Sequence, residues 1–252
     1  MRLVHLISIF SLILIGSCKS QSTEQEIFIN ELGTKKAEAL NVLGDSFENF
    51  LVLNYPKQST LVERTRAFLT DILNNRPYEE FNKPNSKAVL EQLENSGLRK
   101  DIYIYSSEIE SYTNDYQIEQ YLPKNKVTPI DLAEINQNFE EMTDTSELTE
   151  EQILANLESE KRNIEYGKLR PNTNTKGLFL YALAKSMQAD TTYLTYVDFK
   201  TTGLDIIPSN LATGYLTNMS DEELEKWYNR LPLIIDIYYF NLLQSQTPIS
   251  KK

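Results

Sequence analysis

Few side chains in this sequence have the type and spacing needed for catalysis. The 252 residues include one histidine, one cysteine, 15 tyrosines and 36 aspartates and glutamates. No glycine-rich phosphate loop, dinucleotide-binding fingerprint, EF-hand loop or redox cysteine pair occurs. Any chemistry would therefore have to come from carboxylate, tyrosine, lysine or serine side chains. Two facing carboxylates, as in glycoside hydrolases, are the clearest example.

Tyrosines and acidic residues are concentrated between positions 101 and 121. The tyrosines are Tyr103, Tyr105, Tyr112, Tyr116 and Tyr121, and the acids are Asp101, Glu108, Glu110, Asp115 and Glu119. Aromatic faces beside carboxylates can bind sugars. The alternative is that tyrosine is simply the large residue this chain favours. With 36 acidic residues in the sequence, no catalytic pair can be chosen from the pattern alone.

Asp236 is the one acid in an unusual sequence context. It lies in the apolar run from Leu233 to Leu243, which at about 11 residues is too short to span a bilayer and should be central in the core. A buried carboxylate needs a hydrogen-bonding partner, so Asp236 is the first candidate for a polar core site. The more common arrangement would place Asp236 toward solvent in a narrow polar stripe with Asn241.

The first 18 residues resemble the signal sequence of bacterial lipoproteins. Arg2 precedes an apolar run from Leu3 to Ile15, which at about 13 residues is shorter than a membrane-spanning helix. The run ends in Ile15-Gly16-Ser17-Cys18, which is similar to a lipobox. The resemblance implies that residues 1–17 are removed and that Cys18 becomes an acylated N-terminus, carrying chains such as palmitate. Several acyl chains would hold the protein stably on a lipid bilayer.

This processing would limit the chemistry further. Removal of residues 1–17 takes away His5, the only histidine, and the lipid occupies the only thiol. Catalysis with an imidazole base and zinc sites built from histidine and cysteine would then be excluded. The sequence nominates no catalytic residue, cofactor or metal ligand. Lys19 after the cysteine agrees with an outer-membrane location in a Gram-negative cell envelope, by the sorting rule of enteric lipoproteins.

Composition and periodicity predict an all-α fold. Gly (8) and Pro (9) are too scarce for the turns of an all-β sandwich, and the net charge of −11 is unfavourable for nucleic-acid binding. We expect about eight to ten helices in an irregular bundle or in stacked pairs. Helical spacing and capping residues place these helices at 34–54, 61–74, 86–96, 128–142, 149–167, 177–188, 191–202, 208–216, 220–231 and 233–243. A short strand is possible at 102–105, and 168–176 is expected to be a surface loop.

The expected organisation is a signal peptide at 1–17, a tether and docking segment at 18–33, and a helical domain at 34–252. The polar residues 143–148 are the best candidate for a boundary between two halves. Three functions agree with this organisation. The first is a non-enzymatic binding or assembly protein with an envelope protein as partner; the others are a carboxylate-dependent hydrolase or binder of envelope polysaccharide, and an acidic immunity or inhibitor protein.

Overall fold

The computed structural model describes residues 23–122, 167, 170–188, 190–203 and 205–245, and its fold is all-α. The α-helices are α2 (Glu24–Leu32), α3 (Thr34–Asn54), α4 (Leu61–Leu73), α5 (Ser86–Ser96), α6 (Leu98–Ile102), α9 (Leu178–Ser186), α10 (Thr191–Thr201), α11 (Pro208–Asn218), α12 (Asp221–Glu225) and α13 (Phe240–Ser245). Short 3₁₀ segments are η1 (Tyr78–Glu80), η2 (Ser106–Ser111), η3 (Ile118–Tyr121) and η4 (Trp227–Arg230), and η5 (Leu233–Tyr239) is a π-helix. The predicted helices at 128–142 and 149–167, the boundary at 143–148 and Cys18 lie outside the described residues.

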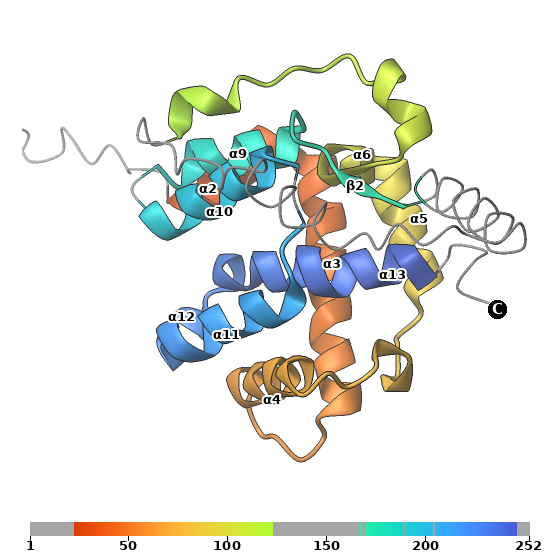
Figure 1. Cartoon of the computed structure of the whole chain (residues 1–252), viewed down its shortest axis with the longest axis vertical. Helices are drawn as coiled ribbons and strands as arrows, with labels where there is room; N and C mark the ends of the chain where they lie inside the picture. Colours follow the sequence, from red (N-terminus) through yellow and green to blue (C-terminus); the bar gives the residue numbers. More distant parts are fainter. Residues whose placement is uncertain (1–22, 123–166, 168–169, 189, 204, 246–252) are drawn as a thin grey trace, which may run out of the picture.

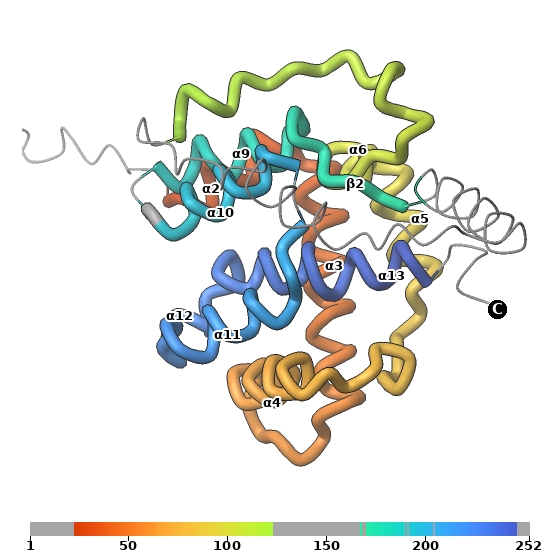
Figure 2. Tube along the Cα trace, in the orientation of Figure 1, coloured from red at the N-terminus to blue at the C-terminus, as the bar shows by residue number. Residues whose placement is uncertain are grey.

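Helix α3 runs along the long dimension of the molecule and connects two groups of helices (Figure 1). The sequence predicts its bounds correctly, because Leu40, Leu43, Phe47 and Phe50 recur at helical spacing and are fully buried. One end of α3 packs against α2, and the other end packs against α4. Figure 2 shows the chain passing along α3 from the first group to the second.

The first group consists of α2, α9 and α10: α9 packs against α2, which is distant in sequence, and against α10, which follows it in the chain. Helix α9 is buried on most of its circumference, as its continuous apolar sequence predicts. Thr23 and Glu26 form a capping box at the start of α2. Within the segment expected to combine a tether and a docking element, Glu24–Leu32 is therefore a docked helix.

The second group consists of α4, α11 and α12. The capping boxes predicted for Thr60 with Glu63 and for Ser220 with Glu223 are both present. Helix α12, however, ends at Glu225, whereas the sequence predicts helix up to residue 231. Arg230 donates two hydrogen bonds of 2.7 Å to the carbonyls of Leu224 and Glu225, so the last carbonyls of α12 are satisfied without a further helical turn.

A two-stranded antiparallel sheet joins two segments that are distant in the sequence. Strand β1 (Tyr103–Ile104) confirms the short strand that propensity suggests, and it pairs with β2 (Asn172–Thr173). The expectation that residues 168–176 form a surface loop is therefore wrong in part. Asn174 donates from its side chain to the carbonyl of Lys100 at 2.6 Å, and Thr173 and Asn174 are buried. Pairing with a distant strand is not visible in local sequence.

The last helical stretch, η5 followed by α13, crosses in front of α3 (Figure 1). Its central location is as predicted: all seven residues from Leu233 to Tyr239 are buried. Its π-helical form is not predicted. Hydrogen bonds in a π-helix close over five residues, so the α-helical period assumed from the sequence does not hold over Leu233–Tyr239. Tyr238 lies against Phe47 and Phe50, with ring centroids 5.4 and 5.1 Å apart.

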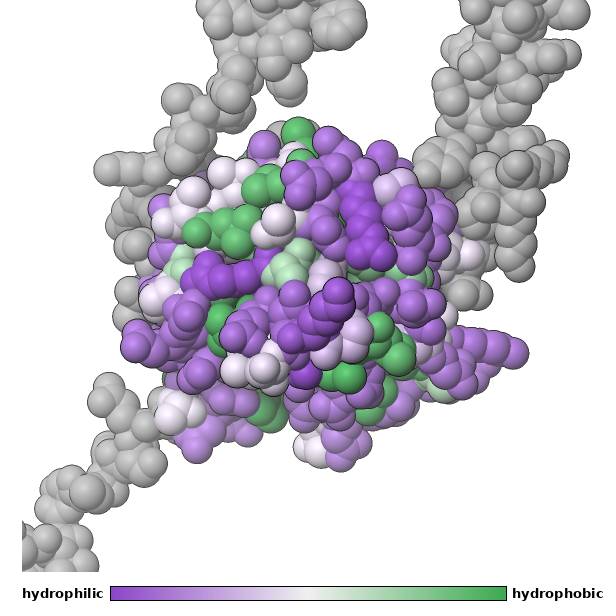
Figure 3. Space-filling model, turned by 90° about the horizontal axis from the view of Figure 1, so that it is seen from below, coloured by the Kyte–Doolittle hydropathy of each residue, from purple (hydrophilic) through white to green (hydrophobic). Residues whose placement is uncertain are grey.

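Hydrophilic residues cover most of the lower face of the molecule, where apolar residues form separate patches (Figure 3). Within the described residues, no helix combines the length and the apolar character that crossing a membrane would require. The surface nevertheless has two exposed apolar side chains near one another in sequence, Phe199 at the end of α10 and Ile207 before α11. Both residues line the pocket described next.

Candidate binding site

A pocket of about 650 Å³ lies between α10, α11 and the segment that joins them. Its wall is rich in aromatic and aliphatic side chains: Tyr193, Tyr196, Phe199, Ile206, Ile207, Leu211, Tyr215 and Met219. Tyr193, Tyr196 and Phe199 follow each other at three-residue intervals along α10, which places them on neighbouring parts of one helix face. Ligand pockets in proteins are typically lined this way and range from about 300 to 1,000 Å³.

The tyrosines of the pocket use their hydroxyl groups inside the protein. Tyr193 donates to the carbonyl of Tyr228, and Tyr215 donates to the carbonyl of Asn229. Tyr196 donates to Oδ2 of Asp236 at 2.8 Å. Because each hydroxyl has a protein partner, only ring atoms can meet a ligand. Tyr193 and Tyr215 are buried, so Tyr196 and the exposed Phe199 present most of the aromatic surface. Burial raises the pKa of all three tyrosines well above the ordinary value, so they remain protonated donors at neutral pH.

Asp236 is the centre of a buried polar cluster behind this wall. Lys200 donates to Oδ1 of Asp236 at 2.7 Å, and the hydroxyls of Tyr196 and Tyr103 donate at 2.8 and 3.1 Å. These four residues come from α10, β1 and η5. The side chain of Asp236 is 3% exposed, so the expectation that it points to solvent with Asn241 is wrong. The structure places it in a polar core site.

Local sequence positions two members of this cluster. Tyr196 and Lys200 are four residues apart on α10, so both side chains lie on one face of the helix. Helix α10 is held in place at its first turn by Asp190, which accepts hydrogen bonds from the backbone of Thr192 and Tyr193, as the sequence predicts. The sequence does not identify Lys200, Tyr196 or Tyr103 as partners of Asp236.

A second hollow of about 210 Å³ opens on the other side of this cluster. Tyr103, Lys200 and Asp236 line it, and it shares Asp205, Ile206 and Ile207 with the larger pocket. Arg170 forms an ion pair with Asp205 in this smaller hollow. Both basic residues of the smaller hollow, Arg170 and Lys200, are thus paired with carboxylates.

The larger pocket has a different charge from the smaller one. Its lining contains the carboxylates of Asp190, Asp205 and Glu223 and, among the residues that the structure describes, no lysine, arginine or histidine. Glu223 accepts a hydrogen bond from the backbone N–H of Ser220 at 2.8 Å, and this bond lowers its pKa. Glu223 is therefore ionised at neutral pH, and the pocket combines an aromatic wall with negative charge.

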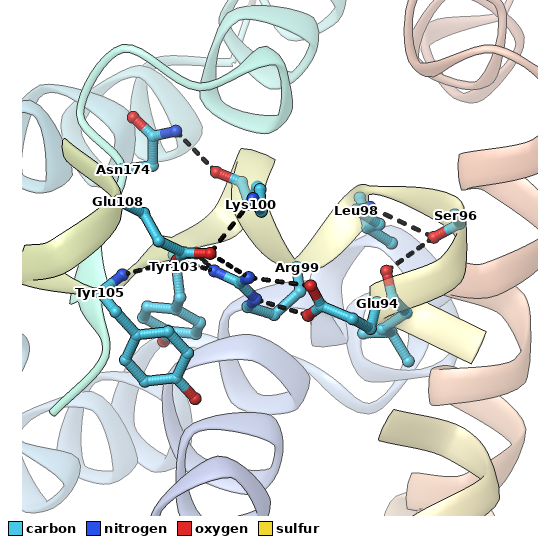
Figure 4. Close-up of polar contacts among 10 residues, drawn as sticks. Glu94, Ser96, Leu98, Arg99, Lys100, Tyr103, Tyr105, Glu108 and Asn174 are labelled. Atoms are coloured by element: carbon cyan, nitrogen blue, oxygen red, sulfur yellow. Dashed lines mark hydrogen bonds and ion pairs between the residues drawn. The ribbon is translucent and has the colours of Figure 1, made fainter. Parts of the chain in front are cut away.

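A second cluster of charges, around Arg99, fixes the backbone that carries Tyr103 (Figure 4). The buried guanidinium of Arg99 donates to Glu94 at 2.7 and 2.9 Å and to Glu108 at 2.5 and 2.7 Å. It also donates to the carbonyl of Tyr103 at 3.2 Å. Tyr103 is thereby held at both ends, by Arg99 at its carbonyl and by Asp236 at its hydroxyl. Glu94 and Glu108 are thus both engaged in holding Arg99 in place.

The other acids of the 101–121 stretch do not form a catalytic pair across a cleft. Asp101 forms an ion pair with Lys36 at 2.5 Å and accepts a hydrogen bond from Tyr112 at 2.9 Å. Glu110, Asp115 and Glu119 are exposed. None of the acids in this stretch lines either of the two hollows. This geometry gives no support to the hydrolase alternative. Among the described residues, no group of three or more histidine, cysteine, aspartate or glutamate side chains is arranged to hold a metal.

Comparison of the chain with protein-family models, with curated proteins and with solved structures finds no match. The fold and the pocket are therefore the available basis for a function.

Proposed function

We propose that this protein is a membrane-anchored, non-enzymatic binding protein of the cell envelope, and that the pocket between α10 and α11 is its binding site. The observation that carries the proposal is the construction of this pocket. About 650 Å³ of space is walled by aromatic residues whose hydroxyl groups are held inside the protein. Such a wall offers apolar contact area at fixed positions, which is the usual character of a ligand site.

The proposed location at the membrane is based on the N-terminal sequence. The lipobox-like residues Ile15 to Cys18 support acylation at Cys18. The polar residues between Cys18 and Thr23 would then connect the lipid to helix α2, which is docked on α9. A lipid-anchored domain with a binding pocket could hold a small molecule or a partner close to the membrane surface.

Gly214 provides a direct way to block the pocket. It lines the pocket from α11, and a Cβ atom added to it meets no atom within 4 Å. Because an added Cβ atom meets no neighbour, we expect the ring of a Gly214→Trp variant to occupy the pocket. Gly214→Ala is the matched control because it changes the same glycine but adds only a methyl group.

The test is native mass spectrometry of protein purified from the envelope fraction of the producing cell. We expect the wild-type protein and the Gly214→Ala variant to carry a bound small molecule that is absent from Gly214→Trp. Thermal unfolding of the three proteins would show that the tryptophan variant is folded. The same bound mass on wild-type and Gly214→Trp protein would overturn the assignment of the ligand to this pocket.

The anchor is tested separately by a Cys18→Ala substitution. We expect the wild-type protein in the membrane fraction and the variant outside it. A variant that stays in the membrane fraction would overturn the proposed lipid anchor and leave the pocket to be judged by its own experiment.

A further inference from the structure

We infer that the pocket between α10 and α11 binds a small organic cation, in which an ammonium or guanidinium group is joined to an apolar body. The inference rests on the proposed function, because it names the ligand class of the same pocket. The charge of the lining, the aromatic wall and the size of the pocket support it independently of each other.

The charge of the lining favours a cation over an anion. Three carboxylates line the pocket, and no basic residue in the described part of the chain does. The two basic residues of the neighbouring hollow cannot serve an anion without losing a partner, because Lys200 is paired with Asp236 and Arg170 with Asp205. Arg170 compensates Asp205, but an anionic ligand would still be repelled by the carboxylates of Asp190 and Glu223. A cation would be attracted to them.

The carboxylates keep acceptor capacity for a ligand. Asp190 accepts two backbone hydrogen bonds through one oxygen, Oδ1, and Glu223 accepts the backbone of Ser220 through Oε2. An ionised carboxylate has two oxygens and about four lone-pair sites. Both side chains can therefore cap their helices and still accept from a ligand.

The aromatic wall also favours a cation. The faces of aromatic rings carry negative electrostatic potential, and a cation within about 6 Å of a ring centre is attracted to it. Because the hydroxyls of Tyr193, Tyr196 and Tyr215 point to protein partners, these rings are held in place before any ligand arrives. A prearranged wall loses little conformational entropy on binding.

The size of the pocket favours an organic cation over a metal ion. A space of about 650 Å³ is much larger than a metal ion, and the lining is mainly apolar. An apolar body would bury the exposed side chains of Phe199 and Ile207 at the pocket. Burial of this apolar surface would add to the affinity.

The experiment is isothermal titration of the folded wild-type chain with three probes that share one alkyl tail: octyltrimethylammonium, octyl sulfate and octyl glucoside, each below its micelle concentration. We expect the ammonium probe to bind about tenfold more tightly than the sulfate and the glucoside, the factor that corresponds to one cation–π contact and one charge contact. Gly214→Trp should abolish this binding, and Gly214→Ala should not.

The charge contribution is tested with a variant that keeps the helix caps. Asparagine caps a helix as well as aspartate does, and glutamine replaces glutamate in a capping box. Asp190→Asn combined with Glu223→Gln therefore removes two charges from the pocket with little effect on α10 and α12. The matched control is Glu26→Gln with Glu63→Gln, which removes two charges from the capping boxes of α2 and α4. We expect the first variant to lose most of the preference for the ammonium probe and the control to keep it.

The outcomes separate the inference from the proposed function. If all three probes bind equally and Gly214→Trp abolishes their binding, the inference that the ligand is a cation is overturned. The proposed binding site would then remain intact. Tighter binding of octyl sulfate, or no binding of the ammonium probe, would also overturn the cation. A preference for ammonium that persists in Gly214→Trp would overturn this pocket as its source.

Discussion

Lys200 and Asp236 form an ion pair with an Nζ–Oδ1 distance of 2.7 Å, although their side chains are only 4% and 3% exposed. Removing two charges from water is costly, and their attraction offsets that cost only when other hydrogen bonds complete the site. Tyr103 and Tyr196 provide those bonds to Asp236. The pair therefore fastens α10, which forms the pocket wall, to η5, which crosses the core.

Loss of one partner of this pair should destabilise the protein strongly. Lys200→Met keeps the length of the side chain but leaves the Asp236 carboxylate buried without a cation. We expect a loss of about 3 to 5 kcal/mol in the free energy of unfolding. Urea unfolding, followed by the fluorescence of the single tryptophan Trp227, measures this loss. The control is Lys87→Met, because Lys87 and Glu91 form an exposed pair for which we expect less than about 1 kcal/mol.

Two helical glycines should respond to alanine in opposite ways. A Cβ atom at Gly44 would lie 2.8 Å from Nε1 of Trp227, whereas a Cβ atom at Gly214 meets nothing within 4 Å. We expect Gly44→Ala to destabilise the protein by about 1 to 3 kcal/mol through overpacking. Gly214→Ala should stabilise it by about 0.5 to 1 kcal/mol, because glycine is a poor helix former. Thermal unfolding of both variants measures the difference, and equal effects would contradict the packing of Trp227 on α3.

Local sequence signals predict the helices whose two ends are both marked. Helix α5 ends before Gly97, whose φ of 81° lies in the left-handed region that glycine favours. Helix α4 begins at the capping box of Thr60 and Glu63. The early end of α12 could not be predicted this way, because Arg230 satisfies its last carbonyls only after the chain has turned back. Pairing of β1 with β2 likewise depends on residues about 70 positions apart.

The candidate site is less accessible to sequence reasoning than the fold. Asp236 could be selected because an acid in an apolar run is unusual. Its cation could not, because Lys200 is 36 residues away and charges on a helix are common. The spacing of Tyr196 and Lys200 on α10 was the one local signal. The pocket itself depends on how α10 and α11 pack, which no single segment determines.

The stability of the protein should depend on the ionisation of Glu108 in acid. A hydrogen bond from Arg99 is the main reason that the pKa of Glu108 falls from 4.5 to about 2. A carboxylate with a lowered pKa stabilises the folded state above its unfolded pKa, and this contribution disappears as the pH falls through the folded pKa. We therefore expect Glu108→Gln to be less stable than wild type at pH 7, with the difference shrinking between about pH 4.5 and pH 2.

Urea midpoints measured at several pH values would check this dependence. The control is Glu110→Gln, which removes an exposed acid two residues away on the same 3₁₀ segment. We expect Glu110→Gln to follow the wild-type curve at all pH values. A difference between wild type and Glu108→Gln that stays constant from pH 7 to pH 2 would contradict the ionic role of Glu108.

The two functions of Tyr196 should be separable by a single substitution. Tyr196→Phe keeps the ring that lines the pocket and removes the hydroxyl that donates to Asp236 at 2.8 Å. Because the carboxylate is buried, losing one donor should lower the free energy of unfolding by about 1 to 3 kcal/mol. Binding of the ammonium probe should change less than about twofold below the unfolding transition, because a cation is attracted to the ring face rather than to the hydroxyl. Tyr196→Leu should instead weaken the binding severalfold, since it removes the ring as well. If Tyr196→Phe and Tyr196→Leu lower the affinity for the ammonium probe equally, the affinity depends on the hydroxyl and its hydrogen bond to Asp236 rather than on the ring face.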